Sequence, residues 1–536
     1  MARFIFVTGG VASSLGKGMA ASCLGALLQA QGYKVRNRKL DPYLNVDPGI
    51  ISPYQHGEVY VTDDGAETDL DLGHYERFTG VSLQKTDTTT SGKIYADVIA
   101  KEKRGFYKGG TIQIIPNITD ATKEFMTSNI TDEDFVICEI GGTVGDIESQ
   151  SFIEAARQLE NELEIKPMFI HLTLIPFIAS ARELKTKPTQ HSVRDLLSMG
   201  IQADILLCRS EKVISEDEKK KIALFCNVKE ENVIQNLDTS FIYELPLQLH
   251  KAGLDIQVLK FFGLKYKENP DLSKWERASE RFYNPKHEIN LAVVGKYVSM
   301  LETYKSLSEA IMHAALANEA KVHIKWVDSE KISKEGAEKY LGDVDAIIVP
   351  SGFGKRGTEG KREAITYARE HKLPVLAIGL GMQMALVDIA RNVLGIADAD
   401  STEVNSVTPN PIVSLLKDLV KKEIIFCELK DDKIRLGARD IGIEKGSILY
   451  SAYGKDTISE RHRHRYSFNP AYKSKFIEAG IVFSAYSEDG EILEAIELPK
   501  EKHPFFVGVL YQPEFKSRVF EPHPLLVSLI KSAIKK

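Results

Sequence analysis

Residues 9–18 have the composition of a loop that binds a phosphate chain. They read Gly-Gly-Val-Ala-Ser-Ser-Leu-Gly-Lys-Gly, directly after an apolar stretch at 3–8. In such a loop the backbone amides and the start of the next helix point at the anion, and Lys17 adds a full positive charge. The usual pattern has glycine at Val11 and Ser or Thr at Gly18. We interpret the loop as a variant nucleotide-phosphate site; the simpler reading is an ordinary turn with a surface lysine.

Two carboxylates could hold the metal ion that accompanies a triphosphate. Asp71 ends a strongly acidic loop at 63–71, and Glu139 ends the apolar stretch 135–139. In an open α/β sheet, ligands bind at the carboxyl ends of the strands. Mg²⁺ at such sites uses one or two carboxylates together with phosphate oxygens. We therefore expect Asp71 and Glu139 to bind Mg²⁺, although a lone carboxylate at this place could also cap a helix.

The elements that position these residues follow from the alternation of the chain. Short apolar stretches predict strands, and helical spacing at 19–30 predicts a helix after the loop. This alternation predicts an α/β fold with a mostly parallel sheet and helices on both faces. We expect a first domain over 1–265, a charged, proline-containing linker over 266–287 and a second domain over 288–536. The predicted strands are 3–8, 135–139, 168–172, 204–208, 289–295, 346–349 and 374–378.

Composition narrows the function classes. The chain has 536 residues and a net charge of -6, so nothing in its charge favours nucleic-acid or membrane binding. No apolar stretch is long enough to span a bilayer, and the N-terminus lacks the pattern of a signal peptide. The five scattered cysteines lack metal-binding spacing. We expect them to be reduced core residues of a cytoplasmic protein.

Several long motifs resemble one family, the CTP synthases, which aminate UTP to CTP. They are 7–18, 39–43, 55–59, 64–77, 139–148 and 185–190. The resemblance implies an N-terminal amidoligase domain with a dethiobiotin-synthetase-like fold and a C-terminal class I glutamine amidotransferase domain that delivers ammonia through an internal tunnel. It also implies Mg²⁺, the substrates ATP and UTP, GTP as allosteric activator, and a homotetramer built as a dimer of dimers.

The same resemblance assigns roles to residues of the first domain. Lys17 and Lys39 would stabilise the phosphoryl group moving from ATP to O4 of UTP, before ammonia displaces phosphate. One departure is Asn117, where the family usually has histidine. The implied ATP residues are Ser14, Leu15, Gly16, Lys17, Gly18, Met19, Asp71, Leu237, Asp238 and Thr239. The implied UTP and CTP residues are Ser13, Asp146, Ile147, Glu148, Lys185, Thr186, Lys187, Pro188, Thr189, Gln190 and Lys221, and the metal ligands are Asp71 and Glu139.

The second domain departs from the family where its chemistry would lie. A class I amidotransferase needs a cysteine thiolate on a sharp strand-to-helix turn, a histidine base and a glutamate that orients the histidine. The nucleophile position is Gly379 and the base position is Gln512, so only Glu514 remains. Ser351 and Ser467 also replace the usual glycine and glutamate. Because glycine cannot form a thioester and glutamine cannot act as a base near pH 7, we expect the glutaminase activity to be lost.

Other features of the domain are retained. The remnant of the glutamine pocket is Gly352, Leu380, Gly381, Met382, Gln383, Glu403 and Arg465, and the GTP-sensing candidates are Arg356 and Glu359. These residues could also persist only because the domain still folds. Cys427 lies in a different apolar stretch, 423–427, so it is a poor substitute nucleophile.

Three alternatives to an ammonia-using synthase stay open. The Cys-to-Gly change could be engineered, although the coincident changes favour natural loss. The chain could be a catalytically silent nucleotide-binding regulator, or a P-loop ATPase. An active synthase of this kind would take ammonia from solution or from a separate glutaminase.

Overall fold

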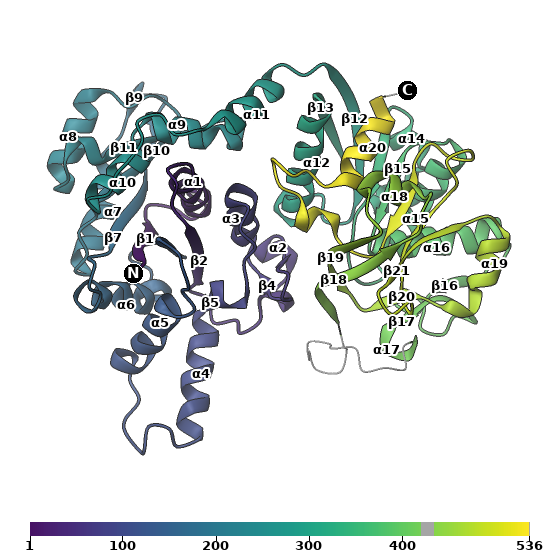
Figure 1. Ribbon diagram of the computed structural model, residues 1–536, viewed down its shortest axis with the longest axis horizontal. Coiled ribbons are helices and arrows are strands. Elements are labelled where there is room, and N and C mark those ends of the chain that lie inside the picture. The colour runs from purple at the N-terminus through teal and green to yellow at the C-terminus, as the bar shows by residue number, and fades with distance from the viewer. Residues whose placement is uncertain (420–433, 535–536) are drawn as a thin grey trace. The chain divides into compact units, whose positions relative to one another are not determined.

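The computed structural model describes residues 1–419 and 434–534, and within these ranges the chain forms two compact units (Figure 1). The first unit contains residues 1–51 and 71–280, and the second contains residues 52–70 and 281 onward. This division differs from the expected ranges in one main respect, because residues 52–70 pack with the C-terminal unit. The chain therefore passes between the units three times.

The first unit is built on a parallel sheet. Among the described residues it has seven strands in the order β11-β10-β7-β1-β6-β2-β5, and every neighbouring pair is parallel, as the sequence predicted. The central strands β1 and β6 are buried along almost their whole length because helices cover both faces of the sheet. The strands are β1 (Arg3–Gly9), β2 (Val35–Asp41), β5 (Thr88–Thr90), β6 (Phe135–Ile140), β7 (Met168–Leu174), β10 (Ile205–Ser210) and β11 (Val233–Leu237).

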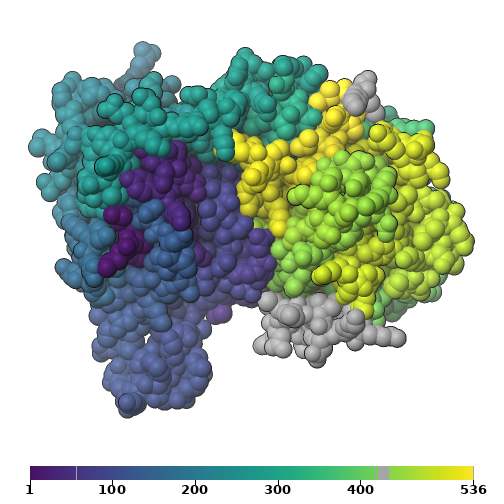
Figure 2. Space-filling model, viewed as in Figure 1, coloured from purple at the N-terminus to yellow at the C-terminus, as the bar shows by residue number. Residues whose placement is uncertain are grey.

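Helices connect these strands, and α4 with the loop that follows it projects from the body of the first unit (Figures 1 and 2). A short hairpin, β8 (Phe177–Ile178) and β9 (Glu183–Leu184), precedes α7. The helices are α1 (Lys17–Ala30), α3 (Asp71–Thr79), α4 (Ser91–Lys103), α5 (Thr119–Thr127), α6 (Gln150–Glu162), α7 (Lys187–Ser198), α8 (Glu216–Cys226), α9 (Leu245–Lys251), α10 (Leu254–Phe261) and α11 (Ser273–Tyr283).

The predicted linker over 266–287 contains helix α11, so it is not an irregular connection. Trp275 and Ala278 are buried three residues apart on one face of this helix. The Trp275 ring stacks on Phe78 with 5.4 Å between ring centroids. Many charged residues surround this short apolar stripe in the sequence, and they obscured its helical period.

The second unit has a larger mixed sheet. Its order over the described residues is β13-β12-β14-β15-β23-β22-β21-β18-β19, parallel from β13 to β23 and antiparallel beyond. The strands are β12 (His287–Gly295), β13 (Ala320–Asp328), β14 (Ala346–Val349), β15 (Val375–Ile378), β18 (Arg435–Ile443), β19 (Thr457–His464), β21 (Val482–Ser487), β22 (Leu493–Glu497) and β23 (Phe506–Val509). A small sheet joins β16 (Ala399–Ser401), β17 (Asn410–Leu415) and β20 (Tyr466–Phe468).

Helices pack on both faces of this sheet as well (Figure 1). Each face of the sheet has its own hydrophobic core cluster. One cluster includes residues of α15 and α16, and the other includes residues of α12 and α20. The predicted strand at 423–427 lies outside the described residues. The helices are α12 (Lys305–Ala317), α13 (Ser329–Glu335), α14 (Glu338–Leu341), α15 (Thr358–Glu370), α16 (Leu380–Asp388), α17 (Leu416–Leu419), α18 (Ile448–Tyr453), α19 (Lys473–Glu478) and α20 (Pro524–Ile534).

Cys23, Cys138, Cys208 and Cys226 are buried and free, as expected, whereas Cys427 falls outside the described residues. In the part of the chain that the structure describes, no helix has the length and apolar character needed to cross a membrane.

Residues 52–70 pack in the second unit through ion pairs and hydrogen bonds to two arginines of β19. They form α2 (Pro53–His56), β3 (Tyr60–Val61) and β4 (Glu67–Thr68). Arg461 of β19 is fully buried; its Nε lies 2.7 Å from Asp63 Oδ1, and its Nη1 donates to the Tyr60 hydroxyl at 2.7 Å. Arg463 Nε lies 2.7 Å from Glu67 Oε1. A buried guanidinium needs such partners, so β19 fixes the acidic loop in this unit.

We predict that Arg461→Met lowers the stability of the second unit by about 3 kcal/mol, because it leaves buried acceptors without their donor. Thermal unfolding should show a midpoint lower by about 5–10 °C. Lys445→Met is the matched control, since Lys445 and Asp456 form an exposed pair and its loss should shift stability by less than about 0.5 kcal/mol. Equal effects of the two substitutions would contradict the anchoring role of Arg461.

Candidate functional site

The loop between β1 and α1 has the backbone geometry of an anion-binding turn. Val11 and Ser14 have φ of 77° and 56°, and Gly16 has φ of 98°. A β-branched residue rarely adopts this left-handed conformation, so Val11 keeps the backbone that glycine would supply in the usual pattern. Strain of this kind accumulates at functional sites. Helix α1 begins at Lys17 without a side-chain cap, which leaves its first amides available to a ligand.

Gly18 has a steric reason to be glycine. A Cβ at this position would lie 2.0 Å from Asp71 Oδ1, the first residue of α3. The carboxylate of Asp71 thus occupies the space that a Ser or Thr side chain takes in the usual phosphate loop. This contact explains the departure from the pattern and places Asp71 beside the loop; its predicted role as a metal and ATP residue stays a prediction.

A buried lysine joins the predicted metal ligands. Lys39, at the end of β2, donates from Nζ to Glu139 Oε1 at 3.0 Å and also contacts the Asp71 carboxylate. The hydroxyl of Tyr75 donates to the other oxygen of Glu139. Lys39 is only 4% exposed and Glu139 only 1%, so these charges are shielded from water. We call Lys39, Asp71 and Glu139 the carboxylate–lysine centre.

The charges of the centre shift one another's pKa values. Burial alone would lower the pKa of Lys39, but Asp71 and Glu139 outweigh it and raise the pKa well above its ordinary value. Burial raises the pKa of Glu139, and the nearby Asp71 carboxylate adds to the rise. The pKa of Asp71 is lowered, because the ammonium of Lys39 outweighs its burial. The site therefore holds a cation between two carboxylates.

These residues suit Mg²⁺ bound together with a nucleotide. Among the described residues no group of three or more His, Cys, Asp or Glu side chains could hold a metal by itself. Mg²⁺ with a triphosphate needs only one or two carboxylates, because phosphate oxygens and water complete its shell. Asp71 and Glu139 both contact the ammonium of Lys39, which shows that their oxygens face a common cation position.

Two further cations fix the loop. Lys17 Nζ donates to the Gly142 carbonyl at 2.6 Å, and burial lowers its pKa. Arg209, at the end of β10, donates to the carbonyls of Ser14 at 3.3 Å and Leu15 at 3.0 Å. Its Nε lies 2.8 Å from Asp238 Oδ1. Sequence reasoning missed Arg209, although its place at the carboxyl end of a buried strand was a signal for a ligand-side residue.

The implied nucleotide residues gather at the carboxyl edge of the sheet. Val144 N donates to Gly9 O at 2.8 Å, which places the loop after β6 beside the phosphate loop. Asp146, Ile147 and Glu148 are exposed in that loop. Leu237 ends β11, and Thr239 donates to Glu244 at 3.1 Å beyond it. Of the remaining loop residues, Ser13 and Ser14 are exposed, Leu15 is buried and Met19 is half-buried.

Helix α7 brings the implied basic segment to the same edge. A Cβ at Gly10 would lie 1.7 Å from Ser192 Oγ, so α7 packs directly against the start of the loop. Thr189 is buried and donates to Thr173 of β7 at 3.0 Å. Thr186 and Gln190 bond to each other, Lys185 pairs with Glu183, Lys187 and Lys221 are exposed, and Pro188 is half-buried.

Asn117, the position where a histidine is usual, accepts a hydrogen bond from Gln113 N at 2.9 Å. The side chain therefore closes its own turn and has no contact with the carboxylate–lysine centre in the hydrogen bonds of the structure.

In the second unit, Gly379 sits on a sharp turn between β15 and α16. Its φ of 55° and ψ of −111° are unfavourable for any residue with a side chain. Strand-to-helix turns of this kind present the nucleophile in many hydrolases. The backbone at Gly379 thus has the form of such a turn, and the residue at its tip has no side chain.

The space next to this turn is filled. A Cβ at Gly379 would lie 2.5 Å from Ser351 Oγ, 3.1 Å from Ser351 Cβ and 3.4 Å from Gln512 Nε2. Gln512 donates from Nε2 to Ser351 Oγ at 3.3 Å and to the Arg463 carbonyl at 3.4 Å. The three positions that depart from the expected triad and oxyanion loop are therefore in mutual contact.

Glu514 is buried, with an exposed fraction of 7%. Within residues 1–419 and 434–534 its Oε2 has no hydrogen-bond partner. Burial raises the pKa of Glu514 to about 8, and the carboxylates of Glu58 and Glu460 add to the rise. An imidazolium at position 512 would favour the charged form, whereas the amide of Gln512 does not. The carboxyl group is therefore neutral at neutral pH.

The remnant of the glutamine pocket is partly occupied by internal contacts. Glu403 accepts from Gly354 N at 2.6 Å, and the Arg465 guanidinium lies 5.7 Å from the Phe353 ring centroid. Gln383 donates to Tyr466 O at 3.3 Å. Gly352 is half-buried, and Leu380, Gly381 and Met382 are buried at the start of α16.

The GTP-sensing candidates have different partners. Arg356 donates to the Tyr54 hydroxyl at 2.9 Å and to the Lys296 carbonyl at 2.8 Å. Glu359 pairs with Arg362 and Arg391. Among the described residues, the hydrogen bonds and ion pairs give Arg356 and Glu359 no common partner.

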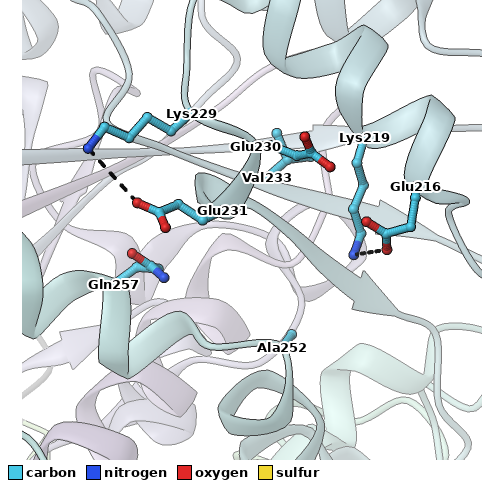
Figure 3. A pocket seen from close by; sticks show the side chains of 8 residues that line it. All are labelled: Glu216, Lys219, Lys229, Glu230, Glu231, Val233, Ala252 and Gln257. Atoms are coloured by element: carbon cyan, nitrogen blue, oxygen red, sulfur yellow. Dashed lines mark hydrogen bonds and ion pairs between the residues drawn. The ribbon is translucent and has the colours of Figure 1, made fainter.

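A pocket of about 580 Å³ on the first unit lies outside all predicted site residues (Figure 3). Lys219 Nζ lies 3.1 Å from Glu216 Oε1, and Lys229 Nζ lies 3.9 Å from Glu231 Oε1. Because each lysine has an acidic partner, the pocket offers no excess positive charge to a phosphate.

Comparison with known proteins identifies the family. A family model described as CTP synthase N-terminus matches residues 3–264, and one described as glutamine amidotransferase class-I matches residues 299–532. The CTP synthase of Paramagnetospirillum magneticum is 54% identical over 540 residues, which cover 100% of this chain and 99% of that protein. The chain belongs to the CTP synthase family. The CTP synthase of Rhizorhabdus wittichii is 55% identical over 542 residues, with the same coverage.

Membership of the CTP synthase family confirms the resemblance seen in the motifs, and with it the α/β fold of both units and the class of enzyme, a ligase with an amidotransferase domain. A solved structure of the glutaminase domain of Trypanosoma brucei CTPS with bound acivicin is 35% identical. It covers 46% of this chain and 94% of that chain, with a TM-score of 0.42. The residue roles within the family remain predictions.

We predict that Glu514→Gln weakens the pH dependence of stability. In the unfolded chain the carboxyl ionises near pH 4.5, but in the folded protein only near pH 8. The folded state thus binds more protons between these values, and the free energy of unfolding falls as pH rises through them, by about 4 kcal/mol in total. In Glu514→Gln, which has no carboxyl group at this position, the free energy of unfolding should fall less between pH 4.5 and pH 8.

The measurement is chemical unfolding at pH 5 and pH 8. Glu501→Gln, at an exposed position, is the control and should follow the unmodified protein. Parallel declines for Glu514→Gln and the unmodified protein would refute the buried neutral carboxyl.

Proposed function

We propose that this CTP synthase makes CTP from UTP with free ammonia as the nitrogen donor and that it does not use glutamine. The proposal that glutamine is not used rests on the filled space at the turn of Gly379, where a Cβ would lie 2.5 Å from Ser351 Oγ. The proposal that CTP is made from UTP rests on family membership, and the carboxylate–lysine centre beside the phosphate loop supports it.

In this proposal the first unit transfers the γ-phosphoryl group of ATP to O4 of UTP, and ammonia then displaces phosphate at C4. Phosphoryl transfer needs in-line positioning and cations where negative charge accumulates. Lys17 and Lys39 supply positive charge, and the amides of the loop and of α1 bind phosphate oxygens. Arg209 holds the loop by its carbonyls. Asp71 and Glu139 would hold Mg²⁺, which would supply positive charge to the phosphates.

The second unit lacks both groups that glutamine hydrolysis requires. Gly379 has no sulfur to form the acyl intermediate, and Gln512 cannot accept its proton. Loss of either member of such a pair removes most of the activity. Ammonia must then come from solution or from a separate glutaminase.

Two alternatives are less consistent with the contacts. An engineered Cys-to-Gly change alone would not supply a serine and a glutamine that fit each other across the turn. A silent regulatory subunit would have no need of a buried lysine between two carboxylates, which is costly to maintain. We further propose cytoplasmic location and a homo-oligomer, a dimer of dimers, with GTP as an effector, on family membership alone.

We predict a difference between nitrogen donors. With ATP, UTP and Mg²⁺, purified protein should form CTP from ammonium at a rate at least about a hundredfold above that with glutamine at equal concentration, because the residual reaction lacks both nucleophile and base. CTP measured by chromatography, together with glutamate release, gives the answer. Glutamate release matched to CTP formation would overturn the proposal, and no CTP from either donor would favour a silent subunit.

We predict that Asp71→Asn and Glu139→Gln each lower the rate of CTP formation from ammonium by at least about a hundredfold, because each removes a carboxylate that positions the metal and Lys39. The Mg²⁺ concentration for half-maximal rate should rise about tenfold or more. Glu164→Gln is an exposed control in the same unit. Unchanged rates and Mg²⁺ dependence in both variants would exclude the centre as the metal site.

A further inference from the structure

We propose that Ser351 is a donor-specificity residue that keeps the nucleophile position closed, so that a thiol at 379 and an imidazole at 512 are together insufficient to restore reactivity toward glutamine. This inference rests on the proposed loss of glutamine use and goes one step further. It holds that the nucleophile position at 379 is blocked by the loop after β14, in addition to lacking the two catalytic groups.

The first support is the geometry around Gly379. A Cβ at 379 would lie 2.5 Å from Ser351 Oγ, a separation that carbon and oxygen do not reach without a clash. Rotation of the serine hydroxyl would relieve the contact with Oγ, but Ser351 Cβ, at 3.1 Å, would still have to move away by a few tenths of an ångström. A cysteine sulfur extends beyond its Cβ and needs still more room. The obstacle is therefore a side chain at 351 of any size above glycine.

The second support is that the two sides of the turn cannot move apart. Lys361 of α15 is fully buried, and its Nζ donates to Pro350 O at 2.5 Å and to Ser351 O at 3.2 Å, which anchors the loop. On the other side, α16 packs tightly on the end of β14: a Cβ at Gly381 would lie 2.1 Å from Val349 O. Neither the loop nor the helix has room to yield to a larger residue at 379.

The third support is the contact between Ser351 and Gln512. Gln512 is 2% exposed and donates to Ser351 Oγ at 3.3 Å. Its second hydrogen bond, to Arg463 O at 3.4 Å, holds the amide over the turn. The serine thus fills the space beside Gly379 and also partners the residue at the base position. Replacement of Gln512 alone would leave the serine in place.

The test uses acivicin, an electrophilic glutamine analogue, on the full-length protein. In the restored site the thiolate sulfur at 379 would form a bond to the ring carbon that carries chlorine, chloride would leave, and the thiol proton would pass to the imidazole at 512. Four variants are compared: G379C/Q512H, S351A/G379C/Q512H, S351G/G379C/Q512H, and S351G/Q512H, which lacks the thiol. Intact-protein mass gives the labelled fraction, and thermal unfolding shows that each variant is folded.

We expect S351G/G379C/Q512H to be labelled at least about tenfold faster than G379C/Q512H, with the alanine variant close to the latter because it keeps the Cβ. The thiol-free control should stay unlabelled. Equal labelling rates with serine and glycine at 351 would overturn the proposal, as would a folded glycine variant that remains unlabelled. Failure of the proposed function shows separately, as glutamine-dependent CTP formation by the unmodified protein.

Discussion

The first unit depends on one buried electrostatic arrangement, the ammonium of Lys39 held by Asp71 and Glu139. A buried charge is stable only when compensated, so neither the lysine nor the carboxylates could be retained alone. The arrangement joins three elements that are distant in sequence: β2 supplies the lysine, α3 begins at one carboxylate and β6 ends near the other. It also places α3 against the phosphate loop, where the absence of a side chain at Gly18 makes room for it.

The second unit shows that backbone and chemistry can separate. The turn at Gly379 keeps the conformation of a nucleophile turn, and the parallel strands around it keep the architecture that supports such turns. The side chains around the turn contact each other instead: Ser351 fills the space, Gln512 donates to its hydroxyl, and burial raises the pKa of Glu514 to about 8. If glutamine use is lost as we propose, the fold of this unit is retained for its packing and not for its reaction.

Much of this could be predicted from the sequence. The strand, loop and helix at 3–30 and the turn at 379 were predicted correctly, because each depends on local periodicity and on glycine positions. Asp71 and Glu139 were selected together by the rule that ligands gather where parallel strands end, and the structure places both against Lys39, whereas their role as metal ligands stays a prediction. The role of Arg209 and the filling of the turn by Ser351 depend on contacts between distant residues, which no local pattern reports. Helix α11 was not recognised in the sequence, because its two buried residues are surrounded by charged ones.

Residues 52–70 give the chain an unusual topology, since they leave the first unit, fold among β19 and α12 of the second, and return. A truncation that removed the C-terminal unit would leave residues 52–70 without the surface on which they fold. The side chains of β3 and the acidic groups around it would lose their partners. Removal of the C-terminal unit would therefore expose acidic and aromatic groups of residues 52–70 that Arg461 and Arg463 now contact. A segment inserted in the sequence of the first unit thus depends on the amidotransferase fold for its own packing, whichever nitrogen donor the protein uses.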